Sequence, residues 1–577
     1  MAVLLQVSSP FQFNEFKDLA KLLLDAVHKT FKSSEGWGQF NFLIFGNFHG
    51  MKNILVTVIA LFAGTVLHAQ QLDYMIANGK IIDGSGNSWY YGDVGIKDGK
   101  IVRIGKGTNW TAKRTIDAKG LIVAPGFVDV HTHIEGNDLK VPTANNFIMD
   151  GVTSVVTGNC GSSNVDVAKY FRQLDSVKTS INVATLIGHN SVRNAAMGGQ
   201  QRDPSVDEQK KMEALVEKAM QDGAVGFSTG LIYVPGTYSK TPEVIGLAKA
   251  ASKHNGVYAS HIRDEGDFVT DAVEEAINIG RQANIPVEIS HFKVTYKPNW
   301  GKSTGTLAQV EKARKEGIDV TIDQYPYVAS STTLNTQIPS WALSGGTDSL
   351  IARLKNPKVR AKIKAEVIES IRKKQMNSYD FAVVAYYEAD TSYNGKKISE
   401  INILKKRKPV LADEAETVLE MVEHGSAGMI YFSMNEEDLK RIMRYPFNMF
   451  ASDAGIARFG SGMPHPRAYG TNSRVLGQYV RDAKVITLED AIRRMSSLPA
   501  QKFQLRDRGL IREGMAADIV VFDEGKIGDA ATFIKPHAYA NGFQFVLVNG
   551  QLVVDNGRHT GVRSGQVLKG PGAYSKN

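Results

Sequence analysis

Residues 126–133 read Gly-Phe-Val-Asp-Val-His-Thr-His, a short apolar run that ends in two histidines. Successive side chains of a β-strand point to opposite faces, so His131 and His133, two residues apart, point the same way. At the carboxyl end of a buried strand, both imidazoles can therefore face one metal ion. This stretch predicts a parallel-sheet protein with a metal at the edge where the strands end.

Four more short apolar runs end in a side chain that can bind a metal or transfer a proton. The endings are Cys160, His261, His291 and Asp453. His261 and His291 lie thirty residues apart, the length of one strand–helix unit, and each follows a serine. We therefore expect them at equal depth on neighbouring strands. A thiolate with imidazoles suits Zn²⁺, and three protein ligands leave a fourth position for water.

The spacing of the apolar runs predicts the fold class. Helical periodicity over 212–220 and over 269–277 predicts amphipathic helices between the strands. Eight strands alternating with helices fit an α/β fold, a (β/α)8 TIM-like barrel whose strands are buried on both faces. A doubly wound open sheet is the alternative, but no Gly-x-Gly-x-x-Gly turn follows the first strand. The candidate strands begin near residues 121, 153, 182, 224, 257, 286, 318 and 449.

The chain is too long, at 577 residues, for a single compact core. We expect the metallohydrolase barrel at 123–505. Turn signals separate short strands at both chain ends, 71–122 and 506–577, so these ends are predicted to form one small β domain. Strands seven and eight lie about 120 residues apart, too far for a structureless loop, so an insertion at about 335–445 is predicted as a lid or subdomain.

The residues before 71 carry the signals of export. Met51-Lys52 begins a short basic segment, an apolar run covers 54–66, and Ala69 offers a small residue for cleavage. Residues 51–70 are therefore predicted to be a secretory signal peptide, with a buried helix as the alternative. Residues 1–50 are then an upstream extension, and the mature protein is periplasmic or secreted, without stable membrane insertion after cleavage.

Composition argues against nucleic-acid binding and rules out an internal disulfide. The net charge of +9 is spread among interspersed acidic and basic residues, which gives no support to nucleic-acid binding. The single cysteine excludes an internal disulfide, although an exported protein meets an oxidising compartment. Cys160 is therefore either an inert buried thiol or a metal ligand, and its neighbours favour the ligand.

Asp453 supplies the remaining chemistry of a hydrolase. Bound zinc lowers the pKa of its water to about 7, and a nearby carboxylate can accept the proton and later pass it to a leaving amine. The simpler interpretation is an aspartate that caps the loop after its strand. The other five side chains favour the catalytic role.

The chain resembles the amidohydrolase superfamily, and in detail the N-acyl-D-amino-acid deacylases (D-aminoacylases), over nearly all of residues 72–577. The resemblance rests on six motifs, namely Gly158-Asn-Cys-Gly161, Gly226-Phe-Ser-Thr-Gly-Leu231, Ser260-His-Ile-Arg-Asp-Glu265, Ser290-His-Phe-Lys293, Asp323-Gln-Tyr-Pro-Tyr327, and Ser452-Asp-Ala-Gly455 followed by His465-Pro-Arg467. After Ser452-Asp-Ala-Gly455 the chain leads to Gly460-Ser-Gly-Met-Pro-His465, a loop that departs from the family pattern, so the resemblance does not predict the preferred side chain.

The resemblance implies a role for each matching residue. Cys160, His261 and His291 would hold one zinc tightly, while His131 and His133 with the same cysteine would form a weaker second site. Asp453 would be the acid–base. The residues around the substrate carboxylate would be Lys293, Tyr325, Ser331 and Arg467.

Two of these substrate contacts also have a physical basis. Lys293 lies two residues beyond His291 and should share its face if the strand continues. Arg467 can make a bidentate contact with a carboxylate. His189, after the third strand, lies near the same face, and a structural role is favoured for it.

The sequence thus predicts an exported zinc amidohydrolase that cleaves N-acyl-D-amino acids, a small-molecule substrate class. One alternative keeps the metal but acts on D-dipeptides or on cyclic amides. Dihydroorotase- and hydantoinase-like relatives usually bridge two metals with a carboxylated lysine on strand four, where this chain has Gly226-Phe-Ser-Thr-Gly-Leu231. Another alternative is a secreted binding protein that has lost catalysis.

Overall fold

The computed structural model describes residues 71–574. The predicted upstream extension (1–50) and signal peptide (51–70) lie outside the described residues. Within residues 71–574, eight strands form one parallel sheet, which confirms the predicted (β/α)8 class. In chain order these strands are β6 (Phe127–Asp129), β7 (Val152–Thr157), β8 (Asn182–Gly188), β9 (Gly226–Gly230), β10 (Val257–His261), β11 (Val287–Ile289), β12 (Val320–Gln324) and β16 (Asn448–Phe450).

The barrel closes beyond the ends of its first and last strands. Thr132 and Ala454 form a parallel bridge there. The amide of His133 donates to the Ala454 carbonyl at 2.9 Å, and the amide of Asp453 donates to the His131 carbonyl at 2.9 Å. Closure therefore brings the His-x-His pair beside Asp453, although more than 300 residues separate them (453 − 131 = 322).

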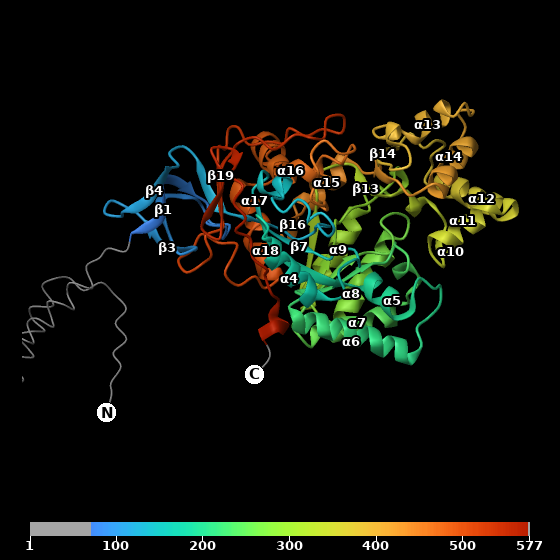
Figure 1. Ribbon diagram of the computed structural model, residues 1–577, viewed down its shortest axis with the longest axis horizontal. Helices are drawn as coiled ribbons and strands as arrows, with labels where there is room; N and C mark the ends of the chain where they lie inside the picture. The colour runs from blue at the N-terminus through green and yellow to red at the C-terminus, as the bar shows by residue number, and fades with distance from the viewer. Residues whose placement is uncertain (1–70, 575–577) are drawn as a thin grey trace, which may run out of the picture. The chain divides into compact units, whose positions relative to one another are not determined.

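Helices surround the barrel because their apolar faces pack on its strands (Figure 1). The predicted face of α8, residues 269–277, is buried at all five of its apolar positions, as predicted. No helix within residues 71–574 is long and apolar enough to cross a membrane. The helices outside the insertion are α3 (Asn145–Ile148), α4 (Val167–Val177), α5 (His189–Met197), α6 (Val206–Asp222), α7 (Thr241–Ser252), α8 (Val269–Ala283), α9 (Ser303–Lys315), α15 (Glu436–Met443), α16 (Arg467–Arg474), the π-helix η5 (Val475–Asp482), α17 (Leu488–Met495) and α18 (Ser497–Lys502).

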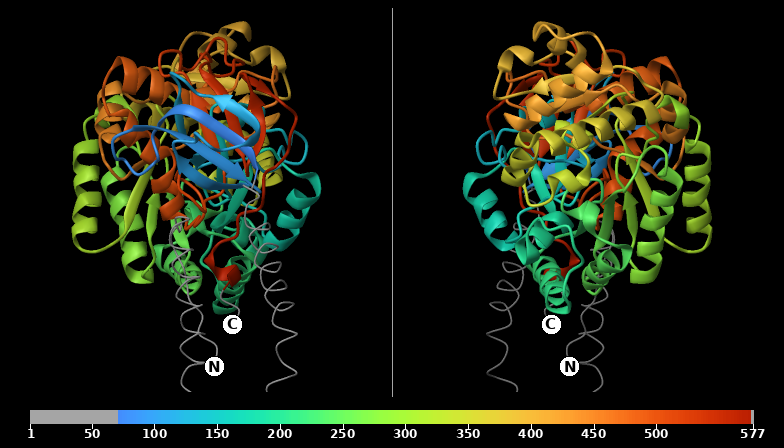
Figure 2. Two further views of the ribbon diagram at one scale, coloured as in Figure 1. Left: turned by 90° about the vertical axis from the view of Figure 1, so that its left-hand side faces the viewer. Right: turned by 90° about the vertical axis from the view of Figure 1, so that its right-hand side faces the viewer.

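A second sheet joins the two ends of the described chain. β5 pairs antiparallel with β17, so early and late strands lie side by side (Figure 2). The predicted first barrel strand near residue 121 is in fact two strands, since β5 belongs to this small sheet and only β6 to the barrel. The nine strands are β1 (Leu72–Ile81), β2 (Tyr90–Lys97), β3 (Lys100–Gly105), β4 (Ala112–Asp117), β5 (Ile122–Pro125), β17 (Ile519–Phe522), β18 (Phe543–Val548), β19 (Gln551–Asp555) and β20 (Arg558–His559).

Gly126 explains the passage from the small sheet to the barrel. A Cβ at this position would lie 2.2 Å from the Thr153 hydroxyl, so only glycine permits this close approach. Its amide donates to the Asp518 carbonyl at 2.8 Å. The small sheet thus extends to Pro125, three residues beyond the predicted end of its first part.

Residues 330–433 form the insertion between β12 and β16. Its antiparallel sheet has the order β13-β15-β14, and its helices share a separate apolar core with that sheet (Figure 1). The insertion begins five residues before the predicted 335. It also ends earlier than 445, because α15 packs against α9 of the barrel. Its elements are β13 (Ser330–Thr333), α10 (Ser340–Leu343), α11 (Thr347–Lys355), α12 (Pro357–Lys373), β14 (Ala382–Tyr386), α13 (Ile398–Leu404), α14 (Leu411–Glu423) and β15 (Gly428–Tyr431).

Candidate metal centre and active site

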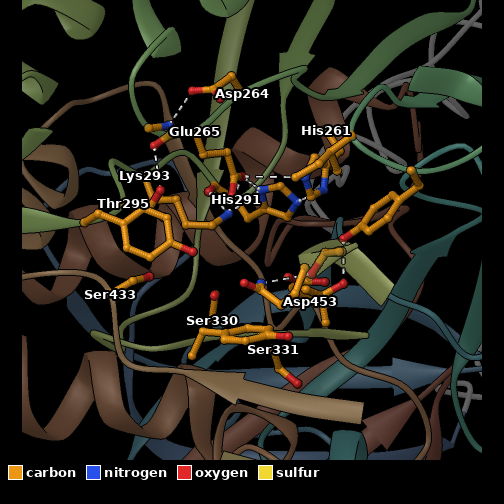
Figure 3. A pocket seen from close by; sticks show the side chains of 18 of the residues that line it. His261, Asp264, Glu265, His291, Lys293, Thr295, Ser330, Ser331, Ser433 and Asp453 are labelled. Carbon is orange, nitrogen blue, oxygen red and sulfur yellow. Dashed lines mark hydrogen bonds and ion pairs between the residues drawn. The ribbon is translucent and has the colours of Figure 1, made fainter. Parts of the chain in front are cut away.

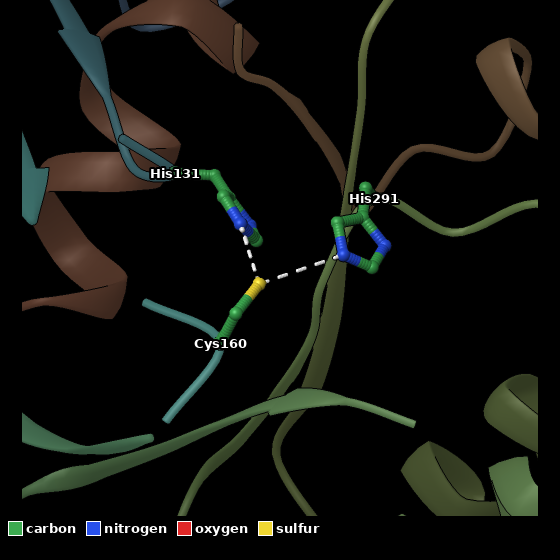
Figure 4. A group of neighbouring side chains, drawn as sticks. All are labelled: His131, Cys160 and His291. Atoms are coloured by element: carbon green, nitrogen blue, oxygen red, sulfur yellow. Dashed lines mark hydrogen bonds between the residues drawn. The ribbon is translucent and has the colours of Figure 1, made fainter. Parts of the chain in front are cut away.

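Cys160 is at the centre of a buried cluster of imidazoles at the carboxyl ends of the barrel strands. Its Sγ lies 3.3 Å from His131 Nε2, 3.5 Å from His261 Nδ1 and 3.7 Å from His291 Nε2. Figure 4 shows the thiol between His131 and His291. The structure therefore brings together the predicted thiol ligand and three of the predicted histidines.

The donor set fits zinc in chemistry and nearly in geometry. Tetrahedral zinc places its sulfur and nitrogen ligands about 3.6 Å apart and two nitrogens about 3.3 Å apart. The three sulfur–nitrogen distances match this value. The His261 Nδ1 to His291 Nε2 distance is 2.7 Å, so these two rings must separate slightly to hold the ion.

The thiol and one imidazole of this group have pKa values that suit a metal ligand, whereas neighbouring acidic groups outweigh burial and raise the pKa of His131 and His291. Burial alone would raise the pKa of the Cys160 thiol, but His131 and His261 outweigh it and hold the pKa well below its ordinary value. Burial, reinforced by His291, lowers the pKa of His261. A thiolate and a neutral imidazole are the forms that bind zinc.

A second group of donors shares His131. Asp453 Oδ1 lies 3.2 Å from His133 Nε2 and 3.6 Å from His131 Nε2. Its other oxygen, Oδ2, forms an ion pair with Arg467 Nη1 at 2.8 Å. Burial would raise the pKa of the Asp453 carboxyl, but Arg467 and then His131 outweigh it, so the pKa stays well below its ordinary value. Asp453 is therefore ionised, the form that a proton acceptor needs.

Backbone strain marks three of the six predicted positions. Cys160, His291 and Asp453 have φ values of 52°, 37° and 50°, in the left-handed region that non-glycine residues seldom adopt. Such strain persists where surrounding structure over-determines it, and it concentrates at functional sites. Each residue follows the end of its strand, so the turn redirects its side chain toward the common centre.

The prediction of equal depth for His261 and His291 is wrong by one residue. Ser260 pairs with Ile289, so His261 corresponds to Ser290, and His291 lies one position further along. β11 ends at Ile289, and the left-handed turn at His291 brings its ring back to His261. The two histidines therefore meet because the turn at His291 compensates for the one-residue offset between the strands, and not because they lie at the same depth.

Lys293 lies in the site, but not for the predicted reason, because the strand does not continue beyond Ile289. Its Nζ folds back and donates to the His291 carbonyl at 2.9 Å and to Glu265 Oε1 at 2.5 Å, with His291 Nδ1 at 2.7 Å. Its charge is therefore already balanced, and each of its three donors faces a protein atom.

The other predicted substrate contacts lie together near Asp453. The Arg467 guanidinium stacks over the Tyr325 ring, with its Cζ 4.5 Å from the centroid. The buried Tyr325 hydroxyl has no hydrogen-bond partner within residues 71–574. Ser331 donates its hydroxyl to the Met429 carbonyl at 2.8 Å, and its own carbonyl accepts from Arg467 Nη2 at 3.2 Å. The free hydroxyl of Tyr325 is the feature best suited to bind a substrate oxygen.

Two carboxylates that the sequence predictions missed, one buried and one partly buried, hold the ligand rings. Asp323 accepts from His131 Nδ1 at 3.2 Å and from the His291 amide at 2.9 Å. Glu265 lies 3.0 Å from His291 Nδ1. Such carboxylate–histidine contacts fix the tautomer and orientation of a metal ligand. Glu265 ends one of the motifs that carry the family resemblance and Asp323 begins another, and this position was the one signal in the sequence that could have identified them.

His465 was also missed, and it positions Arg467. Its Nε2 faces the Ala329 carbonyl at 2.9 Å, and its Nδ1 accepts from the Arg467 amide at 3.0 Å. Burial and the neighbouring Arg467 charge hold the pKa of His465 well below its ordinary value, so it acts as a neutral hydrogen-bonding group. By contrast, His189 lies outside the cluster, where its Nε2 contacts Glu243 at 2.8 Å, a structural arrangement.

A cavity of about 180 Å³ opens beside the cluster (Figure 3). His261, His291 and Asp453 line one side, and the insertion contributes part of the opposite wall through Tyr431 and Ser433. The metal ligands, the carboxylate and the free tyrosine hydroxyl thus meet one enclosed space that a small molecule can enter.

A (β/α)8 barrel with imidazoles, a thiolate and a carboxylate at its carboxyl-end mouth has the structure of a metal-dependent hydrolase. A sequence model of the amidohydrolase family matches residues 114–554, and a model of the urease α-subunit N-terminal domain matches residues 53–128. The chain belongs to the amidohydrolase family. The predicted family is therefore confirmed.

Similar proteins include an N-acyl-D-glutamate deacylase and a D-aminoacylase of Alcaligenes xylosoxydans xylosoxydans. The first is 36% identical over 83% of this chain and 93% of its own length, the second 34% over 87% and 98%. The N-acyl-D-glutamate deacylase of Bordetella bronchiseptica, crystallised with zinc and a phosphonate mimic of the tetrahedral intermediate, has a TM-score of 0.74. It is 35% identical and covers 87% of this chain and 100% of its own.

Proposed function

We propose that this chain is a zinc-dependent hydrolase that cleaves the amide bond of N-acyl-D-amino acids, releasing a carboxylate and a free D-amino acid. One observation carries the proposal. His261, His291 and Asp453 line one cavity, where Cys160 Sγ lies 3.5 and 3.7 Å from the two imidazoles and Arg467 pairs with Asp453. The similarity to deacylases over more than four-fifths of the chain supports the substrate class.

The assignment of ligand roles follows the family resemblance. Cys160, His261 and His291 would hold the first zinc ion, and His131 and His133 complete a second group of donors. Zinc bound there would polarise a carbonyl and make water acidic near neutral pH. Asp323 and Glu265 would keep the His131 and His291 rings in their binding orientation.

Asp453 would carry the proton. As a carboxylate beside both donor groups, it can accept a proton from the attacking water and then pass it to the departing nitrogen. The amide would then break into an acid and an amine, and Asp453 would return to its charged form. Arg467 keeps Asp453 ionised and in place through the 2.8 Å ion pair.

Tyr325 and Arg467 are the best candidates to hold the substrate carboxylate. The Tyr325 hydroxyl is buried and free within the described chain, and the guanidinium stacked on its ring has further donors. Lys293 would contribute less, since it pairs with Glu265 and its three donors already face Glu265 and two atoms of His291. Ser331 would offer its hydroxyl oxygen as an acceptor.

Cyclic amides are a second candidate substrate class, and one observation speaks against them. β9, the fourth barrel strand, has no lysine, and its Ser228 hydroxyl donates to the Gly158 carbonyl at 2.5 Å. The strand thus lacks the residue that, by the resemblance, bridges two metals in hydantoinase-like enzymes. D-dipeptides remain within the proposed chemistry, because their amide and carboxylate have the same arrangement.

A chiral substrate panel tests the proposal. Purified protein with its zinc quantified would be assayed on N-acetyl-D- and N-acetyl-L-amino acids, D-dipeptides and dihydroorotate. We expect turnover of the D-acyl substrates in proportion to bound zinc. Turnover confined to the cyclic amide would refute the proposal, and zinc-free protein without any hydrolysis would favour a non-catalytic binding protein.

We also propose export to the periplasm or the medium, which residues 51–70 support by sequence alone. Expression of the chain from Met51 should yield a mature protein that begins near residue 70. N-terminal sequencing of the secreted or periplasmic fraction checks this. Full-length protein confined to the cytoplasm would contradict it.

A further inference from the structure

Lys374 lines the same cavity and belongs to the insertion. It follows α12 of the insertion and its Nζ lies 4.4 Å from the centroid of the Tyr296 ring. Tyr296 lies beside Ser433, another residue that lines the cavity, and its amide donates to the Ser433 carbonyl at 2.7 Å. Figure 3 shows Thr295 and Ser433 across the cavity from Asp453. A group bound at Asp453 can therefore extend toward Lys374.

Lys374 differs from the other cations of the site in having no counterion in contact. Lys293 pairs with Glu265, and Arg467 pairs with Asp453. Within residues 71–574, no carboxylate oxygen lies within 4.0 Å of the Lys374 ammonium. A half-buried ammonium without a counterion is costly, and an anion that enters the cavity would reduce this cost.

The nearest acidic groups do not fill this role. Asp264 and Asp267 act on Lys374 only at longer range. Asp264 Oδ1 accepts from the backbone amides of residues 266 and 268, at 2.7 and 3.0 Å. Asp267 Oδ1 accepts from the Asn299 side chain at 2.9 Å. Both carboxylates are therefore engaged in holding their own loop.

The wall around Lys374 is polar. Of the side chains that line the cavity, Ile232 is the single aliphatic one within the described chain. The far wall offers hydroxyl and amide groups instead, from Thr295, Tyr296, Thr336, Gln337, Tyr431 and Ser433. Thr295, Thr336 and Tyr431 already donate to backbone carbonyls, so this wall is polar but largely satisfied, and Lys374 is its one cation among the described residues.

We propose that Lys374 binds the side-chain carboxylate of the substrate, so that the chain prefers N-acyl-D-amino acids with an acidic side chain. This inference rests on the proposed deacylase function and makes the insertion the source of specificity. Burial lowers the pKa of Lys374 to about 8, against the opposing effect of Asp264 and Asp267. A bound carboxylate would stabilise the charged form.

The test compares acidic substrates with their neutral isosteres. The kcat/KM values of N-acetyl-D-glutamate and N-acetyl-D-aspartate would be measured beside those of N-acetyl-D-glutamine and N-acetyl-D-asparagine. The native protein should prefer each acid over its amide. In Lys374→Met the acid-to-amide ratio should fall by about 10- to 100-fold, mainly through KM of the acids, because a charge-assisted contact is lost.

Three further variants keep the result interpretable. Lys374→Arg should retain most of the acid preference, and Lys374→Glu should reverse it. Lys373→Met alters the exposed neighbouring lysine, which does not line the cavity, and should leave the ratio unchanged. Melting temperatures of all variants show whether each one folds.

The outcomes separate this inference from the proposed function. If the native protein hydrolyses N-acetyl-D-amino acids but prefers the amides or apolar side chains, the Lys374 inference fails alone. An unchanged ratio in a folded Lys374→Met protein also overturns it. If no N-acetyl-D-amino acid is hydrolysed by zinc-loaded protein, the proposed function fails, and this inference fails with it.

Discussion

Replacing Asp453 by asparagine tests the proposed chemistry most directly. The change preserves size and leaves an oxygen for Arg467, but an amide cannot accept a proton at neutral pH. General-base catalysis contributes about 10²- to 10⁴-fold, roughly 3–5 kcal/mol of transition-state stabilisation. We therefore expect kcat to fall by at least about a hundredfold, with KM much less affected.

The structure predicts which other properties change in Asp453→Asn. The proposed tight zinc group of Cys160, His261 and His291 does not include Asp453, so one zinc per chain should remain. The buried Arg467 loses its counterion at 2.8 Å, so the melting temperature should drop. Asp482→Asn, at an exposed carboxylate, serves as the control. Near-normal turnover in a zinc-loaded, folded Asp453→Asn protein would refute the assigned role.

Three further predictions concern Cys160, Glu265 and Lys374. Cys160→Ser should lose most of its zinc and its activity together, because a serine hydroxyl does not ionise near neutral pH, and elemental analysis beside the assay checks this; full zinc content would contradict it. Glu265→Gln leaves the buried Lys293 uncompensated and should cost roughly 3–5 kcal/mol in urea unfolding, whereas an unchanged midpoint would show that the ion pair adds nothing. Because the pKa of Lys374 is lowered to about 8, its charge is lost as pH rises through that value, so the acid-to-amide ratio of kcat/KM should decline there. The same ratio should stay level in Lys374→Arg, since a guanidinium remains charged, and parallel profiles for the two proteins would exclude Lys374 as the cause.

The sequence predicted the barrel because buried parallel strands appear as apolar runs at regular intervals. Apolar runs recur every 30 to 40 residues up to strand seven, and their polar endings point to one rim. The same pattern assigned residues 121–125 to the barrel, which is wrong, since an apolar run does not show which of two sheets it joins. Only the pairing of β5 with β17, some 400 residues later (519 − 122 = 397), decides that it belongs to the small sheet.

Side-chain geometry at the rim was less predictable than its composition. Lys293 was placed by strand alternation, yet the strand ends at Ile289 and the lysine reaches the site by folding back. No periodicity or spacing in the sequence predicted a role for Glu265 and Asp323, because that role depends on contacts with histidine rings from other strands. Lys374 is more remote still, since it comes from the insertion.

By itself, the sequence determined the chemistry of this protein, namely the donor types at the strand ends and hence a metal-dependent hydrolase. Local periodicity encodes which residues end a strand and which face the core, because both depend on near neighbours. The tertiary structure decided how these donors meet. Barrel closure between Thr132 and Ala454, the left-handed turns at Cys160, His291 and Asp453, and the wall built by the insertion all depend on long-range contacts. Residues 126–133 predict a metal site, and the tertiary contacts around them determine which other residues line that site.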